Sequence, residues 1–197
     1  EMENVRLQSE LATLKSRLNP HFLFNTLNNI DRLIQTDAAK ASTMLTMLSD
    51  VFRYVVYETE NDRISIHKEL EMITKYIELE KIRLANPEAV SLTCSVDKDV
   101  MTPPMLFLPF IENAFKHSNL NQKEARLSVS VAVNHRELTF HCVNTVMHRE
   151  NEAKEQGVGL KLVTERLKLL YPQSHKLQII RNNNEFDVTL NIKLTDD

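Results

Sequence analysis

The sequence predicts an α+β protein in which a helical hairpin, residues 2–60, precedes a domain whose helices cover an antiparallel or mixed sheet. Near the N-terminus, leucines repeat at spacings of four and three, which is the rhythm of a bundle helix or coiled coil. In the second half, apolar and polar residues alternate, which is typical of strands with one buried face. The length of 197 residues suits one domain or two small ones.

Composition excludes several other classes of protein. Charged residues make up 26% of the chain, which is ordinary for a soluble globular protein and excludes disorder and collagen-like repeats. The net charge of -3 gives no electrostatic footprint for nucleic acid, so no direct nucleic-acid partner is expected. The longest uncharged run, residues 100–111, is too short to span a bilayer. Cys94 and Cys142 lack metal or redox spacing and are expected to fill core space as reduced thiols.

Two antiparallel helices are expected in residues 2–60, connected near residues 35–39. Their apolar seams are Leu7, Leu11, Leu14 and Leu18 in the first helix, and Met44, Leu48, Val51 and Val55 in the second. A lone hairpin cannot cover its own apolar face, so we expect a homodimer that forms a four-helix bundle. Residues 1–62 are therefore assigned to a first domain and residues 63–197 to a second.

The second domain opens with a short alternating segment at Ile64 and Ile66, followed by a helix over residues 67–84. A hairpin is expected from residues 127–133 and 138–142, because both segments alternate and a turn-forming segment separates them. A second strand pair is expected from residues 176–181 and 186–194. Further helices are expected over residues 105–118 and 159–171.

The first chemical motif is Leu18-Asn-Pro-His-Phe-Leu-Phe-Asn-Thr-Leu-Asn28. At 100° per residue the apolar stripe changes sides around Pro20, where a helix is expected to kink. Beyond it, the predicted core positions are Leu23, Leu27, Ile30 and Ile34, and His21 and Asn25 point away from the core. A surface or capping role is the alternative for a lone histidine. An exposed, neutral imidazole on a rigid helix suits a nucleophile.

The second motif is Pro109-Phe-Ile-Glu-Asn-Ala-Phe-Lys-His-Ser118, in which four polar residues share one helix face: Glu112, Asn113, Lys116 and His117. A solvated helix face is the alternative. The preceding apolar, proline-rich run favours a central helix whose polar face lines a cleft. Amide and carboxylate oxygens suit Mg²⁺, and lysine suits a phosphate.

The third motif contains both glycines of the chain, Gly157 and Gly159, where average usage would give about 14. They precede an amphipathic helix, so backbone N–H groups there could meet an anion. A simple helix-entry turn is the alternative.

In this order, the three motifs resemble those of the LytS/YehU-like sensor histidine kinases, over about residues 7–194. LNPHFLFNTLN resembles the phosphoacceptor box, PFIENAFKHS the N box, and GVGLKLVTERLKLLYP the G box with its following helix. Arg53, Tyr54 and residues 76–83 also look like family positions.

The resemblance implies a dimerisation and histidine-phosphotransfer hairpin, followed by a GHKL-type (Bergerat) ATP-binding α/β sandwich. It implies a protein-histidine kinase that uses Mg²⁺ and ATP to phosphorylate His21. Asn113 would be the Mg²⁺ ligand, and Glu112, Lys116 and His117 would surround the phosphates or the attacking group. The segment under the ATP lid would contain Gly157, Gly159 and Leu160.

Two positions differ from the pattern of many histidine kinases. Strand parity puts Asn144 where an acidic residue usually holds adenine, and its carbonyl can still accept from the adenine amine. Phe22 follows the phosphoacceptor where an acidic residue is the usual candidate base, so no base is assigned. Asn25, one turn further on, could orient a water or the phosphoryl group.

The resemblance also implies the partner and the setting. The phosphoryl group would pass to the aspartate of a response regulator receiver domain, often one with a LytTR domain. The usual architecture of the family would place transmembrane helices upstream, which is consistent with the start at Glu1 within a helical pattern. The resemblance therefore implies the cytoplasmic domain of a bacterial inner-membrane protein, attached through upstream segments. Two alternatives stay open: a phosphatase-dominant sensor with weak ATP binding, and a catalytically silent dimeric scaffold with a degraded nucleotide site.

Overall fold

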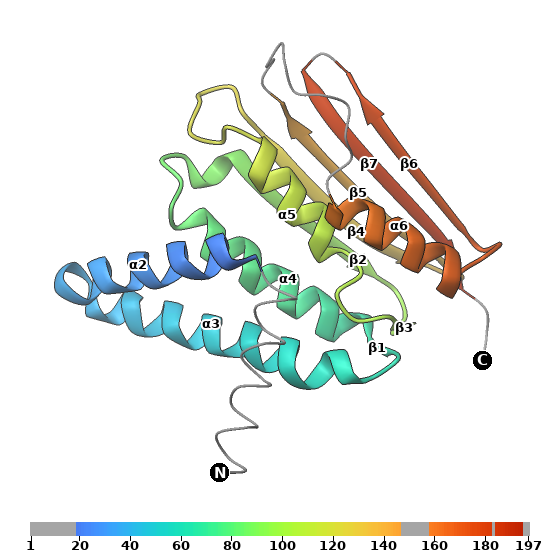
Figure 1. Ribbon diagram of the computed structural model, residues 1–197, viewed down its shortest axis with the longest axis horizontal. Helices are drawn as coiled ribbons and strands as arrows, with labels where there is room; N and C mark the ends of the chain where they lie inside the picture. Colours follow the sequence, from blue (N-terminus) through green and yellow to red (C-terminus); the bar gives the residue numbers. More distant parts are fainter. Residues whose placement is uncertain (1–18, 147–157, 183, 195–197) are drawn as a thin grey trace. The chain divides into compact units, whose positions relative to one another are not determined.

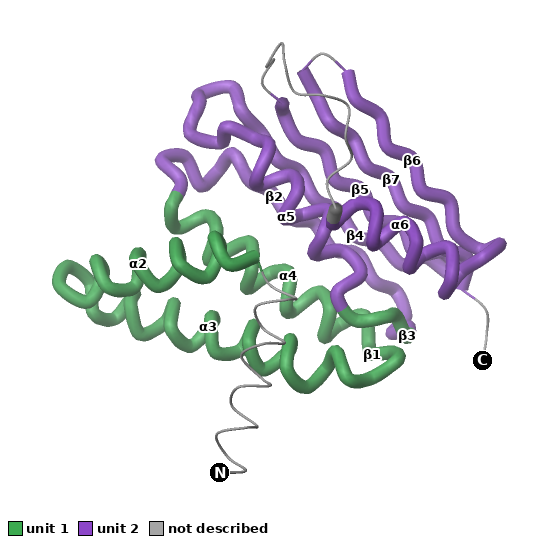
Figure 2. The backbone as a smooth tube through the Cα atoms, in the orientation of Figure 1, with its two compact units in different colours: residues 1–83, 101–104 green, residues 84–100, 105–197 purple. Residues whose placement is uncertain are grey.

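The computed structural model describes residues 19–146, 158–182 and 184–194. The chain divides into two compact units, shown in Figure 2: residues 1–83 with 101–104, and residues 84–100 with 105–197. The expected domain boundary at residues 62 and 63 therefore falls inside the first unit. The helix that follows this boundary contacts the hairpin, which places it in the same compact unit.

The first unit contains three helices, α2 (Pro20–Thr36), α3 (Ala38–Tyr57) and α4 (Ile66–Lys81) (Figure 1). The short helix η1 (Glu58–Glu60) follows α3, and strand β1 (Ile64–Ser65) pairs antiparallel with β3 (Met101–Thr102). Asp37 alone separates α2 from α3, and its carboxylate caps α3 by accepting from the Lys40 N–H at 3.0 Å. The expected helical hairpin is confirmed over the described residues. Its upstream seam, Leu7 to Leu18, and the predicted change of stripe around Pro20 involve residues outside them.

The core face of α2 differs from the predicted seam. Phe22, Thr26 and Ile30 are buried, whereas Leu27 and Ile34 are 44% and 59% exposed. The predicted seam contains apolar residues only, so it does not include Thr26. Its hydroxyl donates to the Phe22 carbonyl at 2.8 Å, so a threonine is buried without a lost hydrogen bond.

The second unit is built on a five-stranded sheet in the order β2-β4-β5-β7-β6. The strands are β2 (Val90–Val96), β4 (Leu127–Asn134), β5 (Glu137–Thr145), β6 (His175–Arg181) and β7 (Glu185–Lys193). β2 and β4 run parallel and the other neighbours run antiparallel, so the sheet is mixed, as predicted. The short helix η2 (Pro87–Ala89) leads into β2, which the sequence analysis did not predict.

Two helices of the second unit, α5 (Leu108–His117) and α6 (Val158–Leu170), cover one face of this sheet (Figure 1). Phe140 of β5 stacks on Phe107 at a centroid distance of 4.9 Å, and Phe110 of α5 lies 5.5 Å from the same ring. Cys142 is buried, as expected. The expectation for Cys94 is wrong: it is exposed, because it lies on the edge strand β2, most of whose residues are exposed.

Within the described ranges, no helix has both the length and the apolar character that crossing a bilayer requires.

Candidate functional site

His21 lies in the first turn of α2, and the local sequence fixes it there. Asn19 caps the helix by accepting from the His21 backbone N–H at 3.0 Å, and Pro20 occupies the first helical position. The His21 side chain is exposed, as the stripe analysis predicts. The Asn25 amide nitrogen lies 3.2 Å from each nitrogen of the His21 ring, so it is within reach of both.

The residue after His21 anchors the helix to the core of the first unit. Phe22 is buried and stacks on Tyr76 of α4, with ring centroids 4.3 Å apart and planes 27° apart. The backbone of α2 is therefore held on its buried side, directly beside the exposed imidazole. Such packing fixes the backbone that carries the neighbouring side chain.

Sequence reasoning missed two buried carboxylates on α4, Glu69 and Glu80. The Tyr54 hydroxyl donates to Glu69, and Arg83 forms an ion pair with Glu80. Burial raises the pKa of Glu80 and outweighs Arg83, His21 and Tyr76, which lower it. The signal that could have revealed Glu80 is its spacing of four from Tyr76, which puts both residues on one helix face.

In the second unit, α5 carries the predicted polar face. Glu112 and Asn113 are half-buried, and Lys116 and His117 are exposed near the C-terminal end of the helix. The opposite face is buried, with Phe110, Ile111, Ala114 and Phe115 in the core. The polar residues of the second motif therefore share one side of a helix whose other side packs in the unit's core.

Asn144 of β5 has the inward parity that the sequence analysis assigns to it. It follows Leu138, Phe140 and Cys142 on the buried face of the strand and is itself 1% exposed. Its amide nitrogen donates to the Thr145 carbonyl at 3.3 Å. Its amide oxygen has no hydrogen-bond partner within the described part of the chain. A buried acceptor without a partner costs about 1–3 kcal/mol, which makes this oxygen notable.

The third motif is described only in part. Gly157 lies outside the described residues, whereas Gly159 is exposed in the first turn of α6. A methyl group added at Gly159 would meet no atom within 4 Å, so packing in the described structure does not require glycine there. Leu160 is buried, with its side chain in the core.

The structure brings the second and third motifs together, because α5 contacts both α6 and β5 in the second unit. His21 belongs to the first unit. Among the described residues, no group of three or more His, Cys, Asp or Glu side chains forms a metal cage. Mg²⁺ is commonly held by one or two protein oxygens together with substrate phosphates, so a site of that kind needs no such cage.

Comparison with known proteins gives a consistent class. A family model described as "Histidine kinase" matches residues 9–87. The sensor protein LytS of Staphylococcus saprophyticus is 28% identical over 201 residues, covering 93% of this chain and 34% of that protein. LytS of Staphylococcus haemolyticus is 32% identical over 169 residues, covering 81% of this chain and 26% of that protein.

The fold has a counterpart among solved structures. The histidine kinase domain from the Erythrobacter litoralis EL346 blue-light activated histidine kinase aligns with a TM-score of 0.56 at 16% identity, covering 98% of this chain and 95% of that one. The helical hairpin and the mixed sheet with its helices thus define a histidine kinase fold.

Within this class, the chain is similar to the LytS sensor proteins. It spans about a quarter to a third of the length of the two LytS proteins that it matches.

Proposed function

We propose that this chain is the kinase core of a two-component sensor, which phosphorylates His21 with Mg-ATP and passes the phosphoryl group to an aspartate of a response regulator. The observation that carries the proposal is the exposed His21 imidazole, fixed by the Asn19 cap and the buried Phe22 within the region that the histidine kinase model matches. The family match favours this kinase over the phosphatase-dominant and silent-scaffold alternatives.

The chemistry of the second unit fits an adenine nucleotide. The unpartnered amide oxygen of Asn144 is a buried acceptor, and the exocyclic amine of adenine is a donor that would satisfy it. An amide accepts this hydrogen bond without the charge assistance of a carboxylate. Asn144 would thus hold the base through its oxygen while its nitrogen stays bonded to the Thr145 carbonyl.

The polar face of α5 fits the phosphate end of the nucleotide. Asn113 would hold Mg²⁺ through its amide oxygen, beside Glu112 on the same half-buried part of the face. Lys116 and His117 would contact the phosphates. Bound Mg²⁺ would neutralise charge on the phosphoryl groups during transfer.

The start of α6 supports a phosphate-binding role for the third motif. Gly159 lies at the N-terminal end of this helix, where backbone N–H groups point toward an anion. The described residues leave space for a side chain at Gly159, and close approach of a ligand would account for a glycine there. Gly157 and Leu160 are proposed to belong to the same segment, and the side chain of Leu160 is buried.

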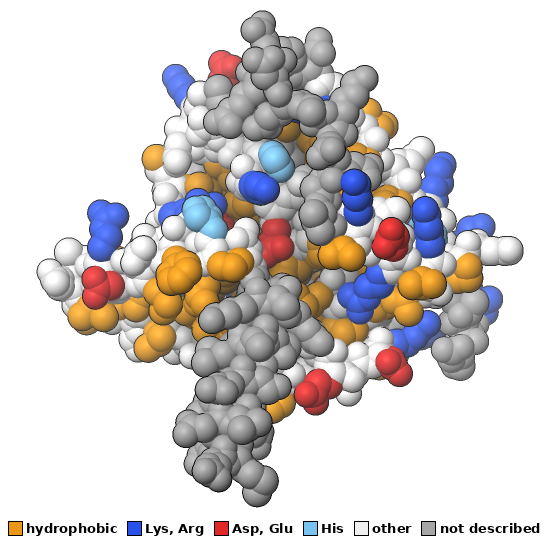
Figure 3. Space-filling view, in the orientation of Figure 1, with side chains coloured by type: hydrophobic (Ala, Val, Ile, Leu, Met, Phe, Trp, Pro, Cys, Tyr) orange, Lys and Arg blue, Asp and Glu red, His pale blue; other side chains and the backbone are white. Residues whose placement is uncertain are grey.

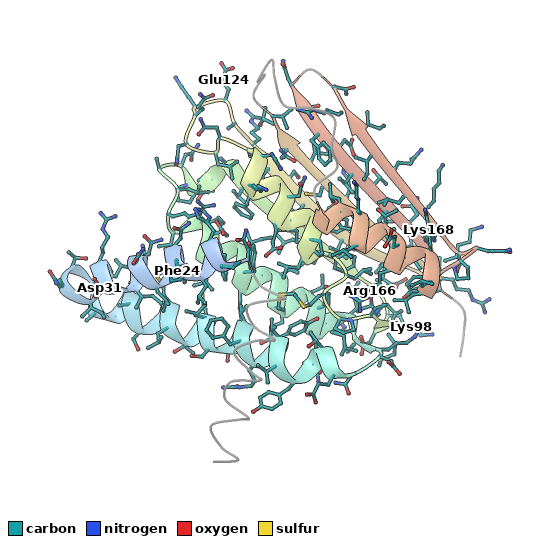
Figure 4. The ribbon with its side chains drawn as sticks, viewed as in Figure 1. Phe24, Asp31, Lys98, Glu124, Arg166 and Lys168 are labelled. Atoms are coloured by element: carbon teal, nitrogen blue, oxygen red, sulfur yellow. The ribbon has the colours of Figure 1, made fainter. Side chains whose placement is uncertain are left out.

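The exposed face of α2 supports the proposed homodimer. Figure 3 shows hydrophobic side chains gathered over α2 and α3, and Phe24 projects from α2 in Figure 4. Phe24 is 65% exposed, and Leu27, Ile34 and Leu45 are also exposed. Exposed apolar patches of this kind mark association surfaces. Light scattering of the chain at micromolar concentration should give a dimer, and a folded monomer would contradict the proposed association.

The proposed partner is the receiver domain of a response regulator, such as one of the LytTR type. The proposed location is the cytoplasmic side of a bacterial membrane, with any membrane anchor supplied by upstream segments.

Asn25 would help to orient the phosphoryl group, because its amide nitrogen is 3.2 Å from both ring nitrogens of His21.

The kinase proposal is tested by incubating the chain with radiolabelled Mg-ATP. Labelling should be acid-labile and alkali-stable, and His21→Gln should abolish it. His67→Gln, which changes another exposed histidine of the first unit, is the matched control and should label normally. Label that survives in His21→Gln would exclude this residue as the acceptor.

The nucleotide site is tested separately by calorimetry with a non-hydrolysable ATP analogue. Asn113→Ala should abolish Mg²⁺-dependent binding and leave the fold intact, since the side chain is half-buried and outside the apolar core. Unchanged affinity for the Mg-nucleotide would exclude Asn113 as the metal ligand.

A further inference from the structure

Glu80 is a carboxylate that the fold buries near the end of α4. It is 4% exposed, and an isolated charge at such a site is costly unless it is paired and hydrogen-bonded. Arg83 pairs with it through Nε, and the Tyr76 hydroxyl donates to it. Both partners stabilise the ionised carboxylate, Tyr76 from α4 itself and Arg83 from just after the end of this helix.

A third group that acts on Glu80 comes from α2. Phe22 stacks on Tyr76, and Tyr76 lies one turn before Glu80 on α4, so this contact brings the first turn of α2 against the same part of α4. The imidazole of His21, next to Phe22, interacts electrostatically with the Glu80 carboxylate. The charged and titratable groups that act on Glu80 are therefore Arg83, Tyr76 and His21.

The neighbours of His21 differ in what they can do with a proton. The amide nitrogen of Asn25 is the atom that faces the ring, 3.2 Å from each nitrogen, and an amide nitrogen donates but does not accept. A ring N–H needs an acceptor, and a carboxylate supplies one. Glu80 has the right chemistry, and the stack of Phe22 on Tyr76 brings the first turn of α2 to its part of α4.

We propose that Glu80 is the proton acceptor paired with His21, in the place of the acidic residue that many histidine kinases carry next to the phosphoacceptor. This inference rests on the proposed function of His21. The residue that follows His21 is Phe22, which cannot accept a proton, so a carboxylate from a second helix would accept it instead.

The step is balanced as follows. A lone pair on one ring nitrogen of neutral His21 forms a bond to the γ-phosphorus of ATP, and the bond from that phosphorus to the β,γ-bridging oxygen breaks, so ADP leaves with the electron pair. The proton on the other ring nitrogen passes to the Glu80 carboxylate, which becomes a carboxylic acid. The phosphorylated ring is left neutral.

The environment of Glu80 suits this role. Burial raises the pKa of its carboxyl, which makes it a stronger base than an exposed glutamate. The ion pair with Arg83 and the hydrogen bond from Tyr76 fix its position. In the proposed pairing, a hydrogen bond from the imidazole to the carboxylate would select the tautomer whose free nitrogen attacks.

The test is the single-turnover rate of His21 phosphorylation in the 197-residue chain with radiolabelled Mg-ATP. Glu80→Gln keeps the shape and an acceptor oxygen for Arg83, and it should lower the rate by about 10²-fold or more, the usual range for general base catalysis. The concentration of ATP that gives half the maximal rate should not change, and Glu80→Asp should recover part of the loss.

The matched control is Glu78→Gln, on the same helix, whose carboxylate is half exposed and pairs with Lys81. It should label at the wild-type rate. A folded Glu80→Gln variant within twofold of the wild-type rate would overturn the proposal, as would an equal loss in Glu78→Gln or an effect on ATP half-saturation alone.

A second measurement does not depend on activity. The ¹⁵N signals of the His21 ring report which nitrogen carries the proton, and the pairing predicts one dominant tautomer in the wild type and a changed tautomer in Glu80→Gln. The same tautomer balance in both proteins would overturn the pairing. If the wild type takes no label but the tautomer changes, the pairing stands and the proposed kinase function fails.

Discussion

Replacing Asn144 by leucine should change the stability of the free chain and its nucleotide affinity in different directions. Asn144 is 1% exposed, its amide oxygen is unpartnered among the described residues, and its amide nitrogen makes one hydrogen bond of 3.3 Å. Leucine loses that hydrogen bond, at a cost of about 0.5–1.5 kcal/mol, and removes a buried unsatisfied acceptor, which gains about 1–3 kcal/mol. Without nucleotide, the free energy of unfolding should therefore fall by no more than about 0.5 kcal/mol and could rise by up to about 2.5 kcal/mol.

Nucleotide binding should respond in the opposite sense. If the Asn144 oxygen accepts from adenine, leucine leaves the amine without its partner, which costs about 1–3 kcal/mol of binding free energy. That loss corresponds to a dissociation constant higher by about 5- to 150-fold. Urea denaturation with and without ADP gives the stability, and calorimetry gives the affinity.

Asn191 provides a matched control on the same sheet. It lies on β7, and its amide oxygen is also buried and unpartnered among the described residues. Its neighbours Leu190 and Ile192 are buried, so Asn191 has the opposite parity and lies on the other face from Asn144. Asn191→Leu should leave ADP affinity unchanged. The reasoning is refuted if Asn144→Leu unfolds more easily by over about 1.5 kcal/mol without nucleotide, or binds ADP as tightly as the wild type.

Three further outcomes are expected. Phe22→Ala should lower the free energy of unfolding by about 3–5 kcal/mol in urea, because a buried, stacked ring is lost, and a loss below about 1 kcal/mol would contradict that packing. A thiol reagent at pH 8 should modify Cys94 in the native protein and Cys142 only in denaturant, since burial raises the pKa of Cys142 to about 12; two reactive thiols in the native state would contradict this. The hydrogen bond from Lys75 lowers the pKa of Asp50, so this pair stabilises the fold above about pH 4 and is lost as the pH falls through the lower folded value. The urea midpoint of Lys75→Met should therefore decline less than that of the wild type between pH 5 and pH 2.5, and equal declines would contradict the linkage.

The sequence predicts most of the regular structure because its strands and helices differ in period. β4, β5 and β7 alternate cleanly between buried and less buried positions, and all three lie where alternation predicts strands. β2 escapes prediction because, on the edge of the sheet, it is mostly exposed and shows no alternation. Its parallel pairing with β4 is a long-range property that no local pattern carries.

The same difference between local pattern and long-range contact decides which candidate site residues the sequence predicts. The exposure of His21 and the inward parity of Asn144 depend on position within one helix or strand, and both follow from the sequence. Glu80 depends on which face of α4 meets α2, and a charged residue has a low prior chance of burial. The burial of Thr26 in place of the apolar Leu27 fails prediction for the same reason, since contacts with other helices decide it.

The buried polar residues of the two units differ in whether the described chain satisfies their polar groups. Thr26 satisfies its hydroxyl within its own helix, and Glu69 accepts from Tyr54. Asn144 keeps an acceptor oxygen that the described chain leaves unused, and Glu80 keeps a carboxylate whose pKa burial raises despite its partners. Apolar residues of similar size would avoid both costs. The proposed roles would offset these costs through groups that the free chain does not contain: an adenine donor at Asn144 and a proton in transit at Glu80.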